Sequence, residues 1–442
     1  MGALAVGSVV HIAAFAHTDA QRTCKGARVS MGGRGGATLR RAVFTSSDLH
    51  CNQAMSTPGR SALLVEGTMR LKAPKRERSS PGGPKLAMIS AGLSLPHPSK
   101  VATGGEDAFM IHVRKAGGGS IAVADGVGGW NAKGINPANY SRCLVHFARN
   151  EILKLTRKED ESKEMINKGL VFMVMKLFKD GLEGKKNSSA KAVMNTAMGR
   201  SKVPGSATMV LAQLDQGTGI LEVANLGDAG LRVFRNGQVV LATTDQQYEF
   251  DMPYQMACRE FVDMDYNTPA DANAERFKVE DGDWVIAGSD GLFDNMFDKE
   301  IAALQQEAAL KGSEAGDEYF TAQVVARALA ERARRYSNDK LRMVPYATAL
   351  AAENGQKKGL GSLVNQARAA GGKPDDITVV AARITTVSKN VTKALNGAEM
   401  DSRIAAKEMQ RIAENSIREN AIRNVPKILP SGTIRVKAGK RV

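Results

Sequence analysis

Residues 121–130 read IAVADGVGGW, an apolar run that leads directly into an aspartate and a glycine-rich turn. A short apolar run bounded by glycines is typical of a buried β-strand, so residues 121–124 predict a strand that ends at Asp125. Glycine lets a backbone approach an ion closely. The Gly126 carbonyl can therefore add an oxygen ligand beside the Asp125 carboxylate, and the stretch predicts a strand end that presents oxygen atoms to a cation.

Three further aspartate loops lie beside apolar runs and repeat this pattern. They are Gly105-Glu106-Asp107, Ser289-Asp290-Gly291 and Pro374-Asp375-Asp376. Asp294 follows Asp290 by four residues, which places both on one side of a helical turn. A lone Asp-Gly pair is usually only a turn. Four such loops beside apolar runs instead indicate a shared site.

The chemistry of that shared site follows from its charge. Two carboxylates about 4 Å apart repel by roughly 4 kcal/mol at an effective dielectric near 20. A divalent cation removes this cost. Because the loops contain only oxygen ligands, with no His or Cys, they favour Mg²⁺ or Mn²⁺ over zinc or copper.

Several strings in this order carry a family resemblance. They are GEDAF (105–109), VADGVGGW (123–130), GSATMV (205–210), ANLGDAG (224–230), GSDGLFDNM (288–296) and GKPDDITVV (372–380). The chain resembles the metal-dependent serine/threonine protein phosphatases of type 2C over roughly residues 100–385. DQQYEFDMPYQ (245–255), TPADANAERFKVEDGDW (268–284) and VPYATA (344–349) are similar to the organellar branch related to the T-cell-activation phosphatase. The resemblance implies an α+β fold, a four-layer α-β-β-α sandwich of two antiparallel sheets flanked by helices, with metals at one edge between the sheets.

The resemblance also implies roles for individual residues. The predicted binuclear Mg²⁺ or Mn²⁺ site consists of Asp107, Asp125, Gly126, Asp290 and Asp375. The residues matched to a weaker third ion are Asp228 and Asp294, together with Asp290. In the implied mechanism, a water that bridges two ions attacks the phosphorus of phosphoserine or phosphothreonine in a protein, without a covalent phosphoenzyme. Asp125 and Asp290 are the predicted catalytic residues.

Two positions depart from the family pattern. Val127 stands where many members carry a His that is a proposed general acid. Lys100 precedes the first acidic motif where many members carry an Arg that clamps phosphate. Lys100 can supply charge but not a bidentate fork, or it is an ordinary surface lysine. These departures motivate an alternative function: a catalytically weak regulator that binds phosphoproteins or metal through the same fold.

A cysteine phosphatase is the rival chemistry. Of the four cysteines, only Cys143 has an Arg six positions later, at Arg149. The intervening residues contain no glycine to turn backbone N–H groups onto a phosphate, and they fit a helix. Cys143 is therefore predicted to be a buried helical residue.

Charge divides the chain into three parts. The formal net charge of 442 residues is +15. Residues 1–85 carry 13 Lys and Arg against 4 Asp and Glu, and residues 383–442 carry 13 against 5, which leaves −2 for residues 86–382. The predicted domains are a targeting or disordered basic segment (1–85), a phosphatase domain (86–385) and a basic helical tail (386–442).

The composition of the ends also bears on location and partners. Residues 1–85 are poor in acids and rich in Ala, Gly, Ser, Thr and Arg, which is typical of a transit peptide for a mitochondrion or plastid. A merely disordered extension is the alternative. No apolar stretch is long enough to span a bilayer, and the basic tail lacks the aromatic residues of a nucleic-acid site, so binding to RNA or DNA is a weaker hypothesis. We expect a monomer that acts on phosphoproteins.

Local patterns predict several further elements. Helices are expected over residues 151–179, 322–335 and 394–424, and an antiparallel meander over residues 206–240. Asn236-Gly237 predicts a type I′ hairpin within that meander. Residues 243–273, with several aromatic side chains, either cover the active-site edge or form a packed connection.

Overall fold

The computed structural model describes residues 85–167, 188–261, 266–314, 316–356 and 370–423, all of which belong to one compact unit, Arg76–Val442. Two antiparallel sheets form its centre. The first has the order β1 (Leu86–Leu95), β13 (Ile377–Thr386), β12 (Trp284–Gly288), β6 (Gly230–Arg235), β7 (Gln238–Ala242). The second has the order β11 (Asn273–Lys278), β5 (Ile220–Leu226), β4 (Ser206–Leu214), β3 (Gly119–Gly126), β2 (Ala108–Val113), with β10 (Met256–Ala257) paired to β4.

The two sheets pack face to face through apolar side chains. Val123 and Val210 of one sheet lie in the same buried cluster as Val285 and Val380 of the other. The strands that contribute them are buried on both faces, which explains why their sequences are continuous apolar runs rather than alternating ones.

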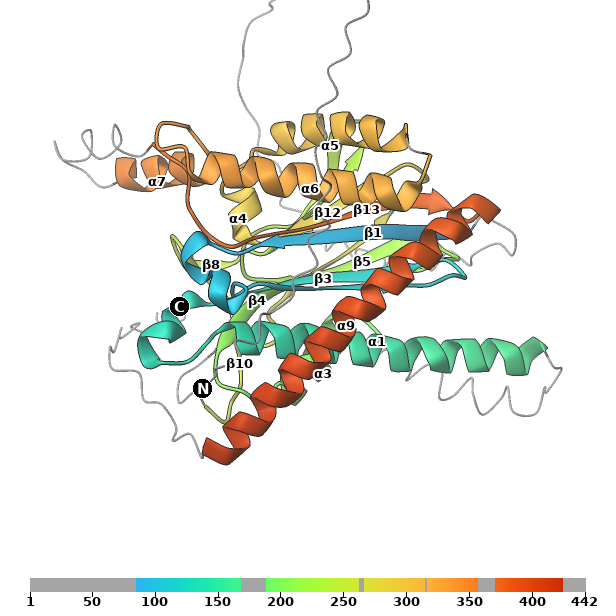
Figure 1. The fold of residues 1–442 in the computed structure, drawn as a ribbon, viewed down its shortest axis with the longest axis horizontal. Helices are drawn as coiled ribbons and strands as arrows, with labels where there is room; N and C mark the ends of the chain where they lie inside the picture. Colours follow the sequence, from blue (N-terminus) through green and yellow to red (C-terminus); the bar gives the residue numbers. More distant parts are fainter. Residues whose placement is uncertain (1–84, 168–187, 262–265, 315, 357–369, 424–442) are drawn as a thin grey trace, which may run out of the picture. The chain divides into compact units, whose positions relative to one another are not determined.

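Helices cover the outer face of each sheet (Figure 1). On the first sheet lie α4 (Asp290–Phe293), α5 (Asp298–Ser313) and α6 (Glu318–Ser337), whose buried residues join those of β12 and β13. On the second lie α1 (Ala138–Asn167) and α3 (Ala190–Arg200), which pack on β3 and β4. Beyond α6 the chain forms α7 (Pro345–Gln356). The predicted α-β-β-α sandwich is confirmed.

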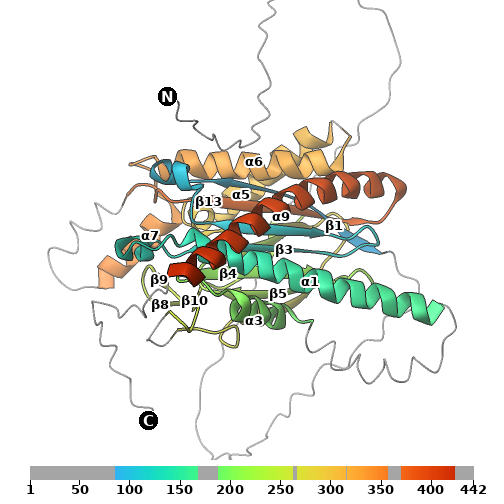
Figure 2. The same cartoon turned by 60° about the horizontal axis from the view of Figure 1, so that its bottom comes forward.

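Helix α9 (Lys389–Arg423) crosses the layers diagonally rather than lying within one of them (Figures 1 and 2). It contacts β1, β2, α1 and α6. Val391 and Leu395 pack on Ala87 and Ile89 of β1, and Ala413 joins the cluster under α1. The helix predicted over residues 394–424 is therefore present, begins at Lys389 and docks on the core. The boundary of the predicted tail domain at residue 386 stays a prediction.

Two other helix predictions can be compared with the structure. The helix expected over residues 322–335 lies within α6. The helix expected over residues 151–179 is α1 as far as Asn167, and the rest of that range lies outside the described residues. Cys143 is fully buried in α1, as predicted, and burial raises the pKa of its thiol to about 12. It is therefore no thiolate nucleophile at neutral pH.

The meander predicted over residues 206–240 is wrong in one respect, because the chain changes sheets within it. Strands β4 and β5 pair in one sheet, whereas β6 and β7 pair in the other. The β6–β7 turn has positive φ at both Asn236 and Gly237, as a type I′ hairpin requires. Apolar runs buried on both faces fit either sheet, so periodicity does not reveal the crossing.

The crossing occurs at Gly227, which has a φ of 95°. A Cβ there would lie 2.5 Å from the Tyr254 carbonyl oxygen, so only glycine fits. The turn also carries Asp228 to the edge where the two sheets meet. A small two-stranded sheet of β8 (Gln247–Glu249) and β9 (Met252–Pro253) follows along the chain. Among the described residues, no helix combines the length and hydrophobicity that crossing a bilayer requires.

We expect Gly227→Ala to lower the free energy of unfolding by about 2 kcal/mol, because alanine would be strained at this φ and would collide with Tyr254. The measurement is chemical denaturation of the purified variant. Gly199→Ala in helix α3 is the matched control, since a Cβ there meets no atom within 4 Å and alanine favours a helix. Equal midpoints for the two variants would contradict the account of the crossing.

Candidate metal centre and active site

Aspartates from both sheets reach one edge of the sandwich because each lies at or next to the end of a strand. Asp125 is the penultimate residue of β3, and Asp107 directly precedes β2. Asp290 begins α4 just after β12, and Asp375 comes shortly before β13. Asp228 lies in the turn between β5 and β6. The sheet pairing therefore converts five distant positions in the sequence into one acidic group.

The electrostatics of Asp125 show that these carboxylates are neighbours. Burial raises its pKa well above the ordinary value, and the charges of Asp107, Asp290, Asp375 and Asp228 raise it further. Burial and neighbouring carboxylates likewise raise the pKa values of Asp228 and Asp375. Like charges held together in a poorly solvated place disfavour ionisation. The predicted residues are thus brought together at a single location.

Asp107 is the most enclosed member of this group, with 5% of its surface exposed. Neither of its carboxylate oxygens has a hydrogen-bond partner of normal geometry, and the same holds for Oδ1 of Asp290. Burial, followed by the charge of Asp376, raises the pKa of Asp107 to about 7, against the opposing effect of the nearby Ser289 and Thr378. Buried polar atoms without partners are costly. Such oxygens suit a cation as their missing partner.

The backbone at Gly126 fits closely around the site. Its N–H donates to the Glu106 carbonyl at 3.2 Å, and a Cβ would lie 2.8 Å from that oxygen and 2.9 Å from the Pro137 carbonyl. Only glycine is accommodated there. The next residue, Val127, donates its N–H to the Ser206 carbonyl and has no side-chain group that transfers a proton.

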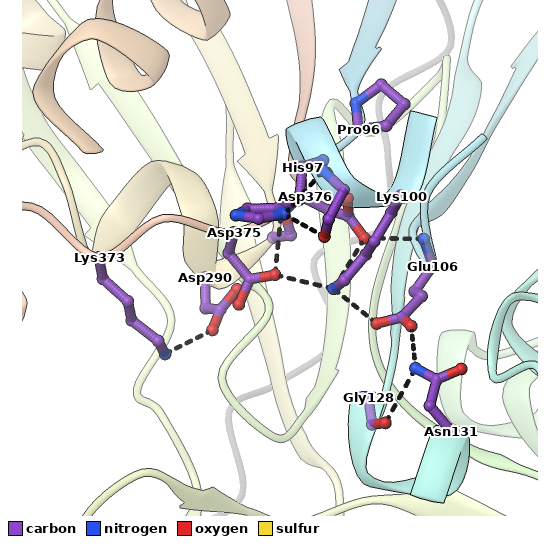
Figure 3. A network of polar contacts seen from close by, with 12 residues as sticks. Pro96, His97, Lys100, Glu106, Gly128, Asn131, Asp290, Lys373, Asp375 and Asp376 are labelled. Atoms are coloured by element: carbon purple, nitrogen blue, oxygen red, sulfur yellow. Dashed lines mark hydrogen bonds and ion pairs between the residues drawn. The ribbon is translucent and has the colours of Figure 1, made fainter. Parts of the chain in front are cut away.

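Lys100 belongs to the site, so the interpretation of this residue as an ordinary surface lysine is wrong. Its ammonium lies 2.7 Å from Glu106 Oε2, 3.3 Å from Asp375 Oδ1 and 3.4 Å from Asp376 Oδ2, and the side chain is 26% exposed (Figure 3). Burial acts to lower the pKa of Lys100, but the Glu106 hydrogen bond and the charges of Asp375 and Asp376 outweigh it and raise that pKa. The lysine therefore remains protonated.

Glu106 and Asp376 were missed as site residues, although each is adjacent in sequence to a predicted aspartate. Asp376 accepts hydrogen bonds from the backbone N–H groups of His97 at 2.5 Å and Glu106 at 2.7 Å. Glu106 Oε1 accepts from the Asn131 side chain at 2.5 Å (Figure 3). These two carboxylates join three loops around the predicted ligands. The Glu-Asp and Asp-Asp pairs were the signal that could have identified them.

Lys373 is the third charged site residue that was missed, and the only cation among the three. Its ammonium lies 2.9 Å from Asp290 Oδ2, 2.8 Å from Asp294 Oδ2 and 2.9 Å from Asp251 Oδ1. Burial acts to lower its pKa, but the charges of Asp290 and Asp294 outweigh this effect and raise it. Asp290 and Asp294 thus lie on one side, as their spacing predicted. Burial, then the charge of Asp290, raises the pKa of Asp294 to about 7.

Asp251 connects residues 243–273 with the site. It lies in the turn between β8 and β9, and the neighbouring Phe250 ring is 5.4 Å from that of Tyr346 in α7. Residues 247–253 therefore lie at the active-site edge, as one of the two interpretations of this segment proposed.

The carboxylates share an edge without already converging on one point. In the part of the chain that the structure describes, no three His, Cys, Asp or Glu side chains are close enough to hold one ion as they stand. The ammonium groups of Lys100 and Lys373 lie among them. Binding of an ion would therefore draw the unpartnered oxygens of Asp107 and Asp290 toward it.

We expect Asp107→Asn to raise the stability of the protein in EDTA at pH 8 by roughly 1–3 kcal/mol, because the substitution removes a buried charge that lacks a partner. Mn²⁺ should then stabilise the variant less than the wild type. Thermal unfolding with and without Mn²⁺ measures both effects. Asp160→Asn, at an exposed position in α1, is the control and should change neither. A loss of stability in EDTA at Asp107→Asn alone would refute this account.

Comparisons with known proteins show which family the chain is similar to. A family model described as Stage II sporulation protein E matches residues 169–342. "Probable protein phosphatase 2C 1" of Oryza sativa subsp. japonica is 36% identical over 320 residues, which cover 71% of this chain and 81% of the rice protein. "Protein phosphatase PTC7 homolog" of Homo sapiens is 31% identical, with 68% and 88% covered.

A solved structure is also similar to this chain. The X-ray structure of the photosystem II phosphatase PBCP shares 32% identity with a TM-score of 0.51, covering 68% of this chain and 100% of that chain. The two rice and human relatives are each at least 30% identical and covered over more than two thirds of their length. The chain therefore belongs to the protein phosphatase 2C family of metal-dependent serine/threonine protein phosphatases.

Proposed function

We propose that this phosphatase hydrolyses phosphoserine and phosphothreonine in proteins at a binuclear Mg²⁺ or Mn²⁺ centre. Asp107, Asp125, Asp290 and Asp375 would hold the two ions, with the Gly126 carbonyl as an additional ligand. The observation that carries the proposal is the buried Asp107 carboxylate, whose oxygens have no hydrogen bond of normal geometry and which lies beside other carboxylates. An enclosed group of oxygen ligands with uncompensated negative charge suits a hard divalent cation.

The ions would supply the chemistry that the side chains lack. When bound, they lower the pKa of water to produce a nucleophile and balance the charge of the phosphoryl group. The chain contributes the geometry. Asp125 comes from one sheet and Asp290 from the end of a strand in the other, so their relative position is fixed by the packing between the sheets. This rigid support is what a site with two ions needs.

Lys100 acts as a positioning residue in this proposal. Three carboxylates already contact its ammonium, so little of its positive charge remains for a substrate phosphate. Its contacts instead join the loop before β2, which carries Asp107, to the loop before β13, which carries Asp375. A lysine is suited to this role because its ammonium can donate to several acceptors at once.

A catalytically weak regulator is the second candidate, and Val127 is the observation that favours it. With valine at this position, the residue after the Asp125-Gly126 pair cannot protonate the leaving serine or threonine oxygen. The two candidates differ in turnover, not in binding. Both should bind Mn²⁺ and phosphoproteins, but only the enzyme releases phosphate.

We expect the full-length protein to release phosphate from a phosphothreonine peptide with Mn²⁺ or Mg²⁺ and to lose this activity in EDTA. Asp290→Asn and Asp375→Asn should each reduce turnover by roughly 100-fold or more, because loss of a metal ligand costs at least as much as loss of its supporting partner. Asp160→Asn is the matched control and should retain activity. A folded protein that binds Mn²⁺ but releases no phosphate from varied phosphopeptides would favour the regulator.

We further propose that the protein acts in a mitochondrion or a plastid. The composition of residues 1–85, which except for Lys85 lie outside the described region, supports this location. A fluorescent protein that carries residues 1–85 should be imported into one of these organelles. The same fusion with Glu at Arg34, Arg40 and Arg41 should not, because acidic residues are rare in transit peptides. Diffuse cytosolic fluorescence of the unmodified fusion would contradict the proposal and favour a simple extension.

A further inference from the structure

Lys373 is fixed in the acidic site from several directions. Its backbone N–H donates to Asn295 Oδ1 and its carbonyl accepts from Asn295 Nδ2, both at 2.9 Å. The next residue is Pro374, which restricts the backbone of Lys373 further. The ammonium lies 4.9 Å from the centroid of the Tyr346 ring, a cation–π contact. With only 18% of its side chain exposed, Lys373 differs from a mobile surface lysine.

The two carboxylate oxygens of Asp290 have different surroundings. Oδ2 contacts Lys373 at 2.9 Å, whereas Oδ1 is buried without a partner (Figure 3). Asp294 Oδ2 and Asp251 Oδ1 complete the group around the ammonium. A carboxylate with one oxygen occupied by a lysine still has the other available for an ion. Lys373 therefore leaves Oδ1 of Asp290 available as a ligand of the predicted binuclear centre.

We propose that the ammonium of Lys373 is a permanent cation of this active site, standing between Asp290 and Asp294 where a third divalent ion would otherwise bind. The centre then loads two ions rather than three. This inference rests on the proposed binuclear function. It replaces the sequence-based assignment of Asp228 and Asp294 to a third ion, because the ammonium already occupies the place between the two carboxylates, 2.9 Å from Asp290 Oδ2 and 2.8 Å from Asp294 Oδ2.

A fixed ammonium differs from an exchangeable ion in what it holds together. Asp251 lies in the β8–β9 turn, and Tyr346 begins α7 next to Pro345. The Tyr346 N–H donates to the Asp294 carbonyl at 3.0 Å. Through these contacts Lys373 joins the β8–β9 turn, α4 and α7 to the loop that carries Asp375. An ion that displaced the ammonium would break its contact with Asp251 and so remove one of the links between the turn and the site.

The test counts the Mn²⁺ ions that the metal-free, full-length protein binds, by electron paramagnetic resonance of the free ion during a titration. We expect two ions for the wild type and for Lys373→Arg, which keeps the positive charge. Lys373→Met, which removes the charge at similar length, should bind three. Lys311→Met is the control and should bind two, since the ion pair that Lys311 forms among the described residues is with the exposed Glu307, four residues away.

The outcomes separate this inference from the proposed function. Three ions in the wild type, or two in a folded Lys373→Met variant, would overturn the role of Lys373 while leaving a metal centre. No Mn²⁺ binding by the wild type would instead overturn the binuclear proposal. If Lys373→Met does not fold, Asp251→Asn provides the test. Asp251 is in an exposed turn with a φ of 62°, a conformation that Asn tolerates. This variant loosens Lys373 and should acquire a weaker third ion, and its failure to do so would then overturn the inference.

Discussion

Mutual repulsion among carboxylates at one edge of the sandwich is the constraint that organises this protein. Asp107, Asp125 and Asp290 come from strand ends of both sheets, and each resists ionisation of its neighbours. The apolar packing between the sheets holds these groups together at a cost to the folded state. A site that stores unfavourable charge in this way is ready to bind cations, because every ion that enters relieves repulsion that folding has already imposed.

Two lysines offset part of this repulsion, at opposite sides of the cluster of carboxylates. Lys100 contacts Glu106, Asp375 and Asp376, whereas Lys373 contacts Asp251, Asp290 and Asp294. Asp107 has no ion pair with either lysine among the described residues, and its buried oxygens make no hydrogen bond of normal geometry. The ammonium groups thus stabilise the margins of the site and leave its centre uncompensated. This division of charge explains how the loops can be ordered while oxygen ligands remain available for metal.

Sequence patterns predicted the parts of this arrangement that depend on local chemistry. Apolar runs that end in Asp-Gly identified the strand ends, whereas the two-sheet sandwich was implied by the family resemblance that the ordered motifs carry. The lysine contacts escaped prediction because they join distant positions: Lys100 is 275 residues from Asp375. The crossing between sheets at Gly227 was not predicted, because strands that are buried on both faces have similar apolar sequences whichever sheet they join. Docking of α9 depends on small residues such as Ala398 and Ala413, which lack a strong periodic signal.

The account is tested most directly by the crystal structure of the Mn²⁺-loaded, full-length protein, with anomalous scattering used to locate the ions. We predict two anomalous peaks at the sheet edge, in contact with Asp107, Asp125, Asp290 and Asp375, and the Lys373 ammonium still between Asp251 and Asp294. The absence of a peak beside Asp107 in a loaded crystal would contradict the central claim that the buried carboxylates form a metal centre.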